Sequence, residues 1–231
     1  MEYFSSAWWS ALLAIVLIDL VLAGDNAIVI ALAARHLPPH LKMKAIAWGT
    51  VGAIVVRSAM TVGVVWLLKI PGLMLVGGLG LLWIACSLLV PQPPTDSHDA
   101  GASSFWGAMK TIVVADALMG VDNVLAVAGA AHGSFDLVIV GLLLSVPIVV
   151  WGSSLVLKLI DRFPSISYVG AGVLAFTAAK MIIGEPMLDP VFDPSAALRA
   201  VTYVVVIAGV LWTGWRAARR QASLSSATSA A

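Results

Sequence analysis

The sequence predicts an all-α, polytopic membrane protein, and three observations support this fold class. First, 61% of the 231 residues are hydrophobic and 11% are charged, whereas about 25% of the residues in a soluble domain are charged. Second, the mean hydropathy is +1.01. Third, the chain contains seven apolar segments, each close to the roughly 20 residues that a membrane-spanning helix needs.

The breaks between the apolar segments define the predicted helices. The first break contains Pro38-Pro39, the second contains Pro71-Gly72, and the longest runs from Pro91 to Ser104. Proline and glycine punctuate helices in this way because they interrupt the helical backbone. The predicted membrane spans cover approximately residues 7–34, 43–68, 72–90, 105–131, 135–158, 166–183 and 198–216.

The polar segment 91–104 divides the chain into two similar parts. Val76-Gly77-Gly78 in the third span resembles Val169-Gly170-Ala171 in the sixth, and a stronger match joins the first and fourth spans. The expected organisation is a first three-helix repeat (1–90), a cytoplasmic linker (91–104), a second, inverted three-helix repeat (105–184), an outer loop with a seventh helix (185–218), and a disordered cytoplasmic tail (219–231).

Basic residues at the span ends predict an N-out, C-in orientation. Cytoplasmic loops carry an excess of lysine and arginine, and with the N-terminus outside only Lys69 and Arg199 clearly lie outside. The first span then runs inward and the fourth outward, so the two repeats are antiparallel. The basic residues expected on the cytoplasmic side are Arg35, Lys42, Lys44, Lys158, Arg162, Arg216, Arg219 and Arg220.

Paired aspartates recur at the same place in the first and fourth spans. An aspartate is followed six residues later by Asp-Asn in both, with an offset of 97 residues. Each carboxylate inside a membrane span costs about 2.5–3.5 kcal/mol on insertion scales, so two pairs in register favour a functional site. Inverted-repeat transporters bind their substrates at the midplane, between the repeats. The predicted site residues are Asp19, Asp25, Asn26, Asp116, Asp122 and Asn123.

The ligands at this depth are all oxygens. The histidines, His36, His40, His98 and His132, lie at span ends or in loops. Carboxylate and amide oxygens suit hard divalent cations such as Mg²⁺, Ca²⁺ and Mn²⁺. Clustered, buried carboxylates also favour proton uptake, so exchange of metal for protons is a natural hypothesis.

Glycines accompany both Asp-Asn pairs. Gly24 and Gly120 permit a local break of the helix, and such a break frees backbone carbonyls, as cation sites in broken helices require.

Structural interpretations of the charged residues also stay open. The aspartates can cap helices or pair with Arg57, a counter-ion within the second span. The linker cluster around His98 can sense a metal or form a solvated loop. Glu185, Asp189 and Asp193 can attract cations to an outer mouth or form a plain surface loop.

The same residues exclude several classes of protein and site. No basic stripe indicates nucleic-acid binding, and the single cysteine, Cys86, excludes a disulfide framework and a cysteine-based metal site. We expect no permanent cofactor and no enzymatic activity. The expected partners are the lipid bilayer, a divalent metal ion and protons, and the sequence predicts no oligomeric state.

At these residues the chain resembles the TerC family of integral membrane proteins. The resemblance covers about residues 7–218 and rests on Leu22-Ala-Gly24-Asp25-Asn26-Ala, Gly120-Val-Asp122-Asn123-Val, and Gly170 to Met181. It implies a seven-span fold related to LysE-type exporters, manganese export across the bacterial inner membrane, and a path lined by Asp19, Asp25, Asp116 and Asp122. Family members often have a third-span lysine similar to Lys180, whereas this chain has Cys86-Ser87 there.

Two other classes of function compete with transport. A membrane scaffold of a metal or tellurite stress-response complex would need interaction surfaces, yet the predicted loops are short. An intramembrane aspartyl hydrolase would resemble a Tyr-Asp plus Gly-x-Gly-Asp pattern, but Asp25 follows Leu22-Ala23-Gly24 and neither Asp19 nor Asp116 follows a tyrosine.

Overall fold

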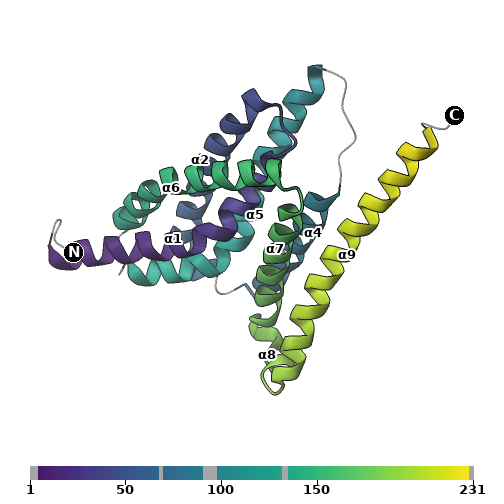
Figure 1. The fold of residues 1–231 in the computed structure, drawn as a ribbon. Helices are drawn as coiled ribbons and strands as arrows, with labels where there is room; N and C mark the ends of the chain where they lie inside the picture. Colours follow the sequence, from purple (N-terminus) through teal and green to yellow (C-terminus); the bar gives the residue numbers. More distant parts are fainter. Residues whose placement is uncertain (1–4, 68–69, 91–97, 132–134, 229–231) are drawn as a thin grey trace.

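The protein is an all-helical membrane protein in the computed structural model shown in Figure 1. The structure describes residues 5–67, 70–90, 98–131 and 135–228. Within these ranges, it does not describe the side chains of residues 21–23, 64–65, 98–104, 122, 125–126, 128–129, 135 and 221–228.

Proline, serine and glycine mark where several of the helices begin and end. The first helix, α1 (Ser6–Ala34), starts at Ser5, whose hydroxyl accepts a hydrogen bond from the Trp8 N–H at 3.2 Å. Helix α2 (Pro39–Val62) has proline at its first position, where the missing N–H costs nothing. The short α3 (Val64–Leu67) follows Gly63, and α4 (Leu73–Leu89) follows Gly72, which has φ +78°.

The remaining helical elements of the described chain follow in order along the sequence. They are α5 (His98–Ala130), α6 (Phe135–Arg162), α7 (Ile166–Ile183), the 3₁₀ turn η1 (Pro186–Leu188), α8 (Asp189–Phe192) and α9 (Ala196–Thr228).

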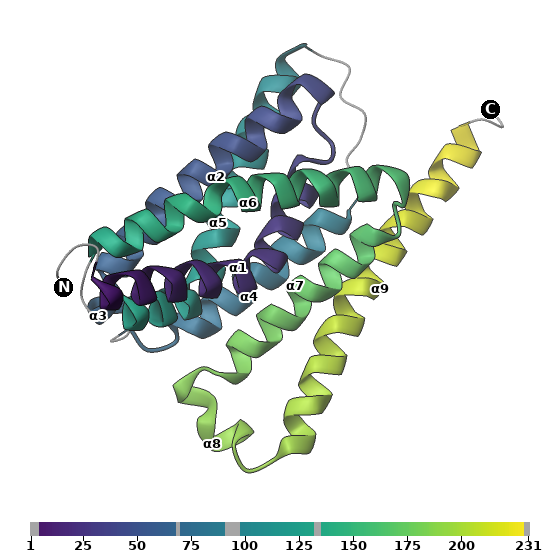
Figure 2. The same cartoon turned by 60° about the vertical axis from the view of Figure 1, so that its left-hand side comes forward.

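Helix packing is reciprocal between the two halves of the chain. Helix α1 packs mainly against α6, α2 mainly against α5, and α4 mainly against α7. Figures 1 and 2 show α9 to one side of this bundle, where it packs on α7 and, less extensively, on α4. Exchanging α1, α2 and α4 for α5, α6 and α7 therefore leaves these three main pairings unchanged.

Two isoleucines separated by the 97-residue offset make equivalent contacts. Ile15 is fully buried on α1 and packs against Gly141 of α6, where an added Cβ would come within 2.5 Å of its side chain. Ile112 on α5 packs against Gly49 of α2, where the corresponding distance is 2.7 Å. Small residues let membrane helices approach closely in this way.

Helices α1 and α5 run antiparallel. The first half of α1, with Trp8 and Leu12, shares a core cluster with Val127 near the end of α5. The second half of α1, with Asn26, instead lies beside Ile112 in the first half of α5. Asp19 and Asp116 lie near the middles of these two helices.

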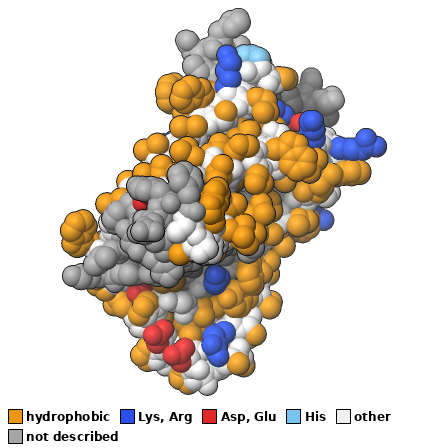
Figure 3. Space-filling view, turned by 90° about the vertical axis from the view of Figure 1, so that its left-hand side faces the viewer, with side chains coloured by type: hydrophobic (Ala, Val, Ile, Leu, Met, Phe, Trp, Pro, Cys, Tyr) orange, Lys and Arg blue, Asp and Glu red, His pale blue; other side chains and the backbone are white. Residues whose placement is uncertain are grey.

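The membrane-facing character of the surface agrees with a multi-pass protein. By length and apolar composition, the described chain has four helices that could each cross a membrane: α2, α7, Asp136–Arg162 and Ala196–Arg220. The bent pair Ser6–Leu20 and Gly24–Ala34 makes a fifth, whereas α4 is an apolar helix of 17 residues. Figure 3 shows hydrophobic side chains covering most of the described surface on one face of the molecule.

Two helix boundaries differ from those expected, the start of α5 and the end of α9. Helix α5 starts at His98, inside the predicted linker, of which residues 91–97 lie outside the described part. Helix α9 continues to Thr228 across the predicted disordered tail. Alanine, arginine, leucine and glutamine are good helix formers, which explains why this polar segment prolongs the helix.

Candidate metal site

One guanidinium joins the aspartates that begin the two repeated motifs. On α2, Arg57 donates from Nη1 to Oδ1 of Asp19 on α1. It also donates from Nη2 to Oδ1 of Asp116 on α5, and from Nε to Asp116 Oδ2 at 3.3 Å. The grip on Asp116 is bidentate, a geometry that the planar guanidinium fork favours. Of the open interpretations, pairing with Arg57 is therefore the one that the structure shows for Asp19 and Asp116.

All three members of this ion cluster are buried. Arg57 is 5% exposed, Asp19 is 3% exposed and Asp116 is 9% exposed. Removing charges from water is costly, and breaking such a buried pair leaves an uncompensated charge. The cluster therefore holds three helices, α1, α2 and α5, in one relative arrangement.

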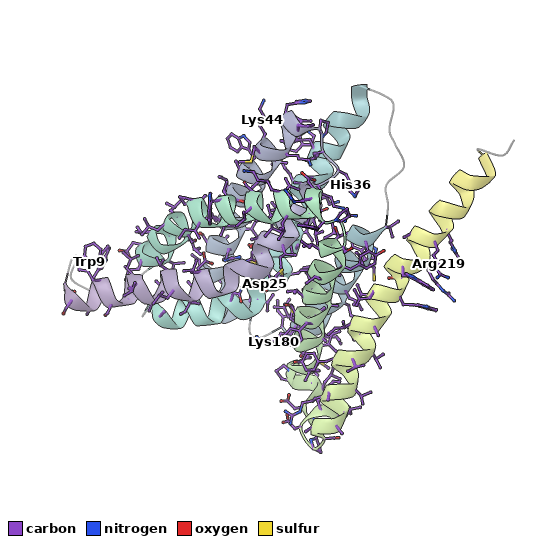
Figure 4. All side chains as sticks on the ribbon, in the orientation of Figure 1. Trp9, Asp25, His36, Lys44, Lys180 and Arg219 are labelled. Carbon is purple, nitrogen blue, oxygen red and sulfur yellow. The ribbon has the colours of Figure 1, made fainter. Side chains whose placement is uncertain are left out.

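Asp25 lies beside this cluster but does not join the ion pairs. Its carboxylate is half-buried and accepts a hydrogen bond from the Asn26 N–H at 2.9 Å, and it interacts electrostatically with Arg57 and Asp116. Figure 4 places Asp25 near the middle of the molecule, with Trp9 at one end of α1 and His36 beyond the other.

The neighbouring Asn26 supplies an unused oxygen. Its side chain is 5% exposed, and among the described groups its Oδ1 accepts no hydrogen bond. Asn26 and Asp116 together line a cavity of about 10 Å³, closed by Val29, Ile30, Ile112 and Met119. This volume is about that of one water-sized sphere, so the space suits a water molecule or a small ion.

The second copy of the motif is described only in part. Asn123 is buried, at 7% exposed, whereas the side chain of Asp122 lies outside the described residues. Within the described residues, no three aspartate, glutamate, histidine or cysteine side chains gather closely enough to hold a metal. The four-carboxylate arrangement expected from the sequence therefore stays a prediction.

The two glycines of the motif lie within helices. Helix α1 bends by 47° between the segments Ser6–Leu20 and Gly24–Ala34, which is the place where the sequence favoured a break. Gly120 lies within the continuous helix α5. An added Cβ at Gly24 or Gly120 would meet no described atom within 4 Å, so neither glycine is required by close packing.

A larger cavity at the far end of α1 has mixed charges and no cluster of carboxylates among its described lining residues. It has a volume of about 400 Å³ and is lined by Arg35, His36, Asp161 and Tyr168, among others. Burial, together with the nearby Arg35 and Lys42, lowers the pKa of His36 below its usual value. Lys42 also pairs with Asp161 at 3.2 Å, so the carboxylates near the middle of α1 remain the candidate cation site.

Glu185 has a structural contact that the sequence did not reveal. Its carboxylate accepts hydrogen bonds from the N–H groups of Gly72 at 3.0 Å, Met74 at 3.1 Å and Leu75 at 3.2 Å, at the start of α4. Burial alone raises the pKa of Glu185, but these backbone donors outweigh it and hold the pKa below the usual value. The loop after α7 is thereby held against α4, and Glu185 is 2% exposed, which does not suit a mouth that attracts cations.

Comparison with known proteins identifies the family. The model of the integral membrane protein TerC family matches residues 4–222. The membrane protein YjbE of Bacillus subtilis (strain 168) is 42% identical over 201 residues, which are 87% of this chain and 92% of YjbE. No solved structure matches the chain.

Two more distant relatives are also named as membrane proteins. YkoY, another membrane protein of B. subtilis, is 25% identical over 191 residues, 74% of this chain and 59% of YkoY. The inner membrane protein YgdQ of Escherichia coli (strain K12) is 23% identical over 194 residues, 76% of this chain and 81% of YgdQ. The matched region of this chain includes the repeated Asp-x5-Asp-Asn motif, the apolar helices and Arg57. The chain belongs to the TerC family of integral membrane proteins.

Proposed function

We propose that this protein exports divalent metal cations, Mn²⁺ foremost, in exchange for protons, across the bacterial inner membrane. The observation that carries the proposal is the meeting of Asp19 and Asp116, one from each repeated motif, at a single buried cation. Two carboxylates that converge on a guanidinium in this way form a site built for positive charge. The inner-membrane location is supported by the relative YgdQ of E. coli, which is named as an inner membrane protein.

The charges and donor types near Arg57 suit a divalent ion. When ionised, Asp19, Asp25 and Asp116 carry three negative charges against the single positive charge of Arg57. One divalent cation would balance the remaining two charges. The oxygen ligands, with the Asn26 Oδ1 that has no partner among the described groups, suit Mn²⁺ or Mg²⁺ better than Zn²⁺ or Cu⁺, which prefer nitrogen or sulfur.

The helix arrangement supports a transporter with two inverted repeats. Antiparallel α1 and α5, and the reciprocal pairs α1–α6 and α2–α5, are what a two-fold axis in the membrane plane would produce. The proposal includes seven spans with the N-terminus outside and the C-terminus in the cytoplasm. Movement of one repeat against the other would expose the site to each side in turn.

An intramembrane aspartyl hydrolase fits the geometry less well. Aspartic protease dyads work because two adjacent carboxylates share one proton. Here Asp19 and Asp116 each bind the guanidinium of Arg57, which lies between them.

The test is metal flux in proteoliposomes that contain the purified full-length protein. Mn²⁺ uptake and release are compared with those of Mg²⁺, Ca²⁺ and Zn²⁺ under an imposed proton gradient. We expect uphill Mn²⁺ movement against the direction of proton flow and its loss when an uncoupler collapses the gradient. Asp136→Asn, which alters an exposed aspartate in the first turn of α6, serves as the matched control.

The outcomes separate the parts of the proposal. Uphill Mn²⁺ movement that ignores the proton gradient would reject proton exchange and keep the metal site. Folded protein that moves none of the four metals would reject transport, and a scaffold would then be the better interpretation.

A further inference from the structure

Arg57 contacts both repeats although it belongs to only one of them. The guanidinium donates to Asp19, in its own repeat, and to both oxygens of Asp116, in the other. These two aspartates are related by the 97-residue offset. The guanidinium of Arg57 therefore lies where a metal ion bound equally by the two repeats would lie.

We propose that Arg57 is a tethered cation that exchanges with the transported metal. In the arrangement seen here Arg57 binds both Asp19 and Asp116 and offsets one of their two negative charges, and metal binding displaces it from at least one of them. This inference rests on the proposed function, because it assigns Arg57 a part in the transport cycle of the same site.

The second repeat has no residue equivalent to Arg57, which supports exchange over a symmetric structural role. The first and fourth spans are related by an offset of 97 residues, and the third and sixth by an offset of 93. Offsets between these values place the counterpart of Arg57 within residues 150–154, which contain no charged residue. One guanidinium thus serves two symmetry-related carboxylates, as one metal ion would.

A buried oxygen beside the ion cluster, without a hydrogen-bond partner among the described groups, also supports exchange. The buried Oδ1 of Asn26 has no partner among the described groups, and Asn26 and Asp116 both line the cavity of about 10 Å³. A bridge with a purely structural role would leave no such acceptor beside it, because an unpaired buried polar atom is costly. A small cation that displaced Arg57 would gain this oxygen.

Electrostatics make metal and guanidinium competitors for the same carboxylate oxygens. Two positive charges that share one carboxylate repel each other strongly in a buried site. Arg57 therefore competes with metal for Asp19 and Asp116. After the metal leaves, Arg57 binds both carboxylates again and offsets one of their two charges, which favours return of the empty carrier across the membrane.

The experiment compares wild type with Arg57→Gln and Arg57→Lys, with Lys44→Gln as a control on the same helix. Lys44 is exposed on α2. Mn²⁺ affinity is measured by calorimetric titration of the purified full-length protein. Net Mn²⁺ export and Mn²⁺–Mn²⁺ exchange are then measured in proteoliposomes, because only net export requires return of the empty carrier.

Exchange predicts opposite changes in binding and net export. Arg57→Gln should bind Mn²⁺ on the order of tenfold more tightly, because one like charge is removed from beside the metal. It should keep Mn²⁺–Mn²⁺ exchange and lose net export. Arg57→Lys keeps the charge but loses the bidentate fork, so its Mn²⁺ affinity should rise by a smaller factor, and Lys44→Gln should match wild type.

Loss of Mn²⁺ binding in Arg57→Gln would overturn the inference, as would binding and net export that both equal those of wild type. Arg57→Gln leaves two buried carboxylates unpaired, so folding of each variant is checked by size-exclusion chromatography. If only Arg57→Lys folds, unchanged or weaker Mn²⁺ binding by that variant overturns the inference. Wild-type protein that binds no divalent metal would instead reject the proposed function itself.

Discussion

Glu185 and Asp116 are both buried carboxylates, but different groups compensate their charges. Backbone N–H groups at the start of α4 surround Glu185, and the positive end of the helix dipole adds to their effect. Asp116 instead depends on a side chain that can move, the guanidinium of Arg57. We infer that Glu185 stabilises a fixed contact between the loop after α7 and α4. The contact of Asp116 with Arg57, in contrast, can break and form again.

The Glu185 contact predicts a pH-dependent stability difference. Glu185→Gln should lower the thermal unfolding midpoint at pH 7 by about 2–4 °C, as expected when about 1 kcal/mol of capping is lost. Because its pKa is below the usual value of 4.5, the stabilisation is fully present above that pH and is lost as pH falls through the lowered pKa. Unfolding midpoints of wild type and variant should therefore converge below pH 4.5, and a constant difference would contradict this assignment.

The ion cluster predicts different costs for replacing its aspartates. Asp116→Asn takes from Arg57 its bidentate partner and should destabilise the fold by about 3–5 kcal/mol, the usual cost of breaking a buried pair. Asp25 is half-buried outside the ion pairs, so Asp25→Asn should fold at normal yield and lose metal transport. Detergent-solubilised yield and Mn²⁺ flux measure the two effects, and normal flux through folded Asp25→Asn would count against Asp25 as a ligand.

At the level of helices, close packing at glycine holds α4 against α7. An added Cβ at Gly78 would lie 2.8 Å from the backbone oxygen of Ala178, and one at Gly77 would lie 2.6 Å from the side chain of Met181. Backbone atoms cannot rotate away as a side chain can. Helices α4 and α7 therefore approach each other more closely than larger residues would allow.

Two glycine substitutions should have opposite effects. Gly78→Ala forces α4 and α7 apart and should cost about 1–3 kcal/mol. Gly24→Ala meets no described atom within 4 Å, so it should fold as well as wild type or better, because alanine favours helix by about 0.5–1 kcal/mol. If the bend beside Gly24 takes part in transport, the folded Gly24→Ala variant should also move Mn²⁺ more slowly. Thermal unfolding and Mn²⁺ flux test the pair, and equal stability of the two variants would contradict the packing argument.

For the whole molecule, the hydrophobic composition and the breaks that contain proline and glycine predicted the helices. They did not predict the contacts between the helices. Each of the seven predicted apolar segments lies on helix in the described chain, because length and hydropathy depend only on local sequence. The 97-residue repeat likewise placed Asp19 and Asp116 at a common depth.

The contacts of the site depend on how distant helices rotate against one another. Arg57 meets partners 38 and 59 residues away, and Glu185 meets Gly72 across 113 residues. The sequence suggested Arg57 only as one counter-ion among alternatives. It gave no sign that Glu185 caps α4, because that contact exists only after both halves have packed.

Topology is a prediction for the entire chain. The distribution of lysine and arginine predicts the C-terminus in the cytoplasm. Reporter fusions after Gln221 should report the cytoplasm, and insertions within residues 185–193 should report the outside. The reverse result would remove the orientation argument for inverted repeats.

The most direct test of the central claim is to locate the metal. Crystals of the full-length protein grown with Mn²⁺ would give an anomalous difference map at the manganese edge. We predict one peak between α1 and α5, with oxygens of Asp19, Asp25, Asn26 or Asp116 at about 2.0–2.6 Å, the range for oxygen-bound divalent ions. Asp25→Asn should weaken or remove the peak. A Mn²⁺ peak elsewhere, with none near these aspartates, would contradict the claim that the repeated aspartates form the transport site.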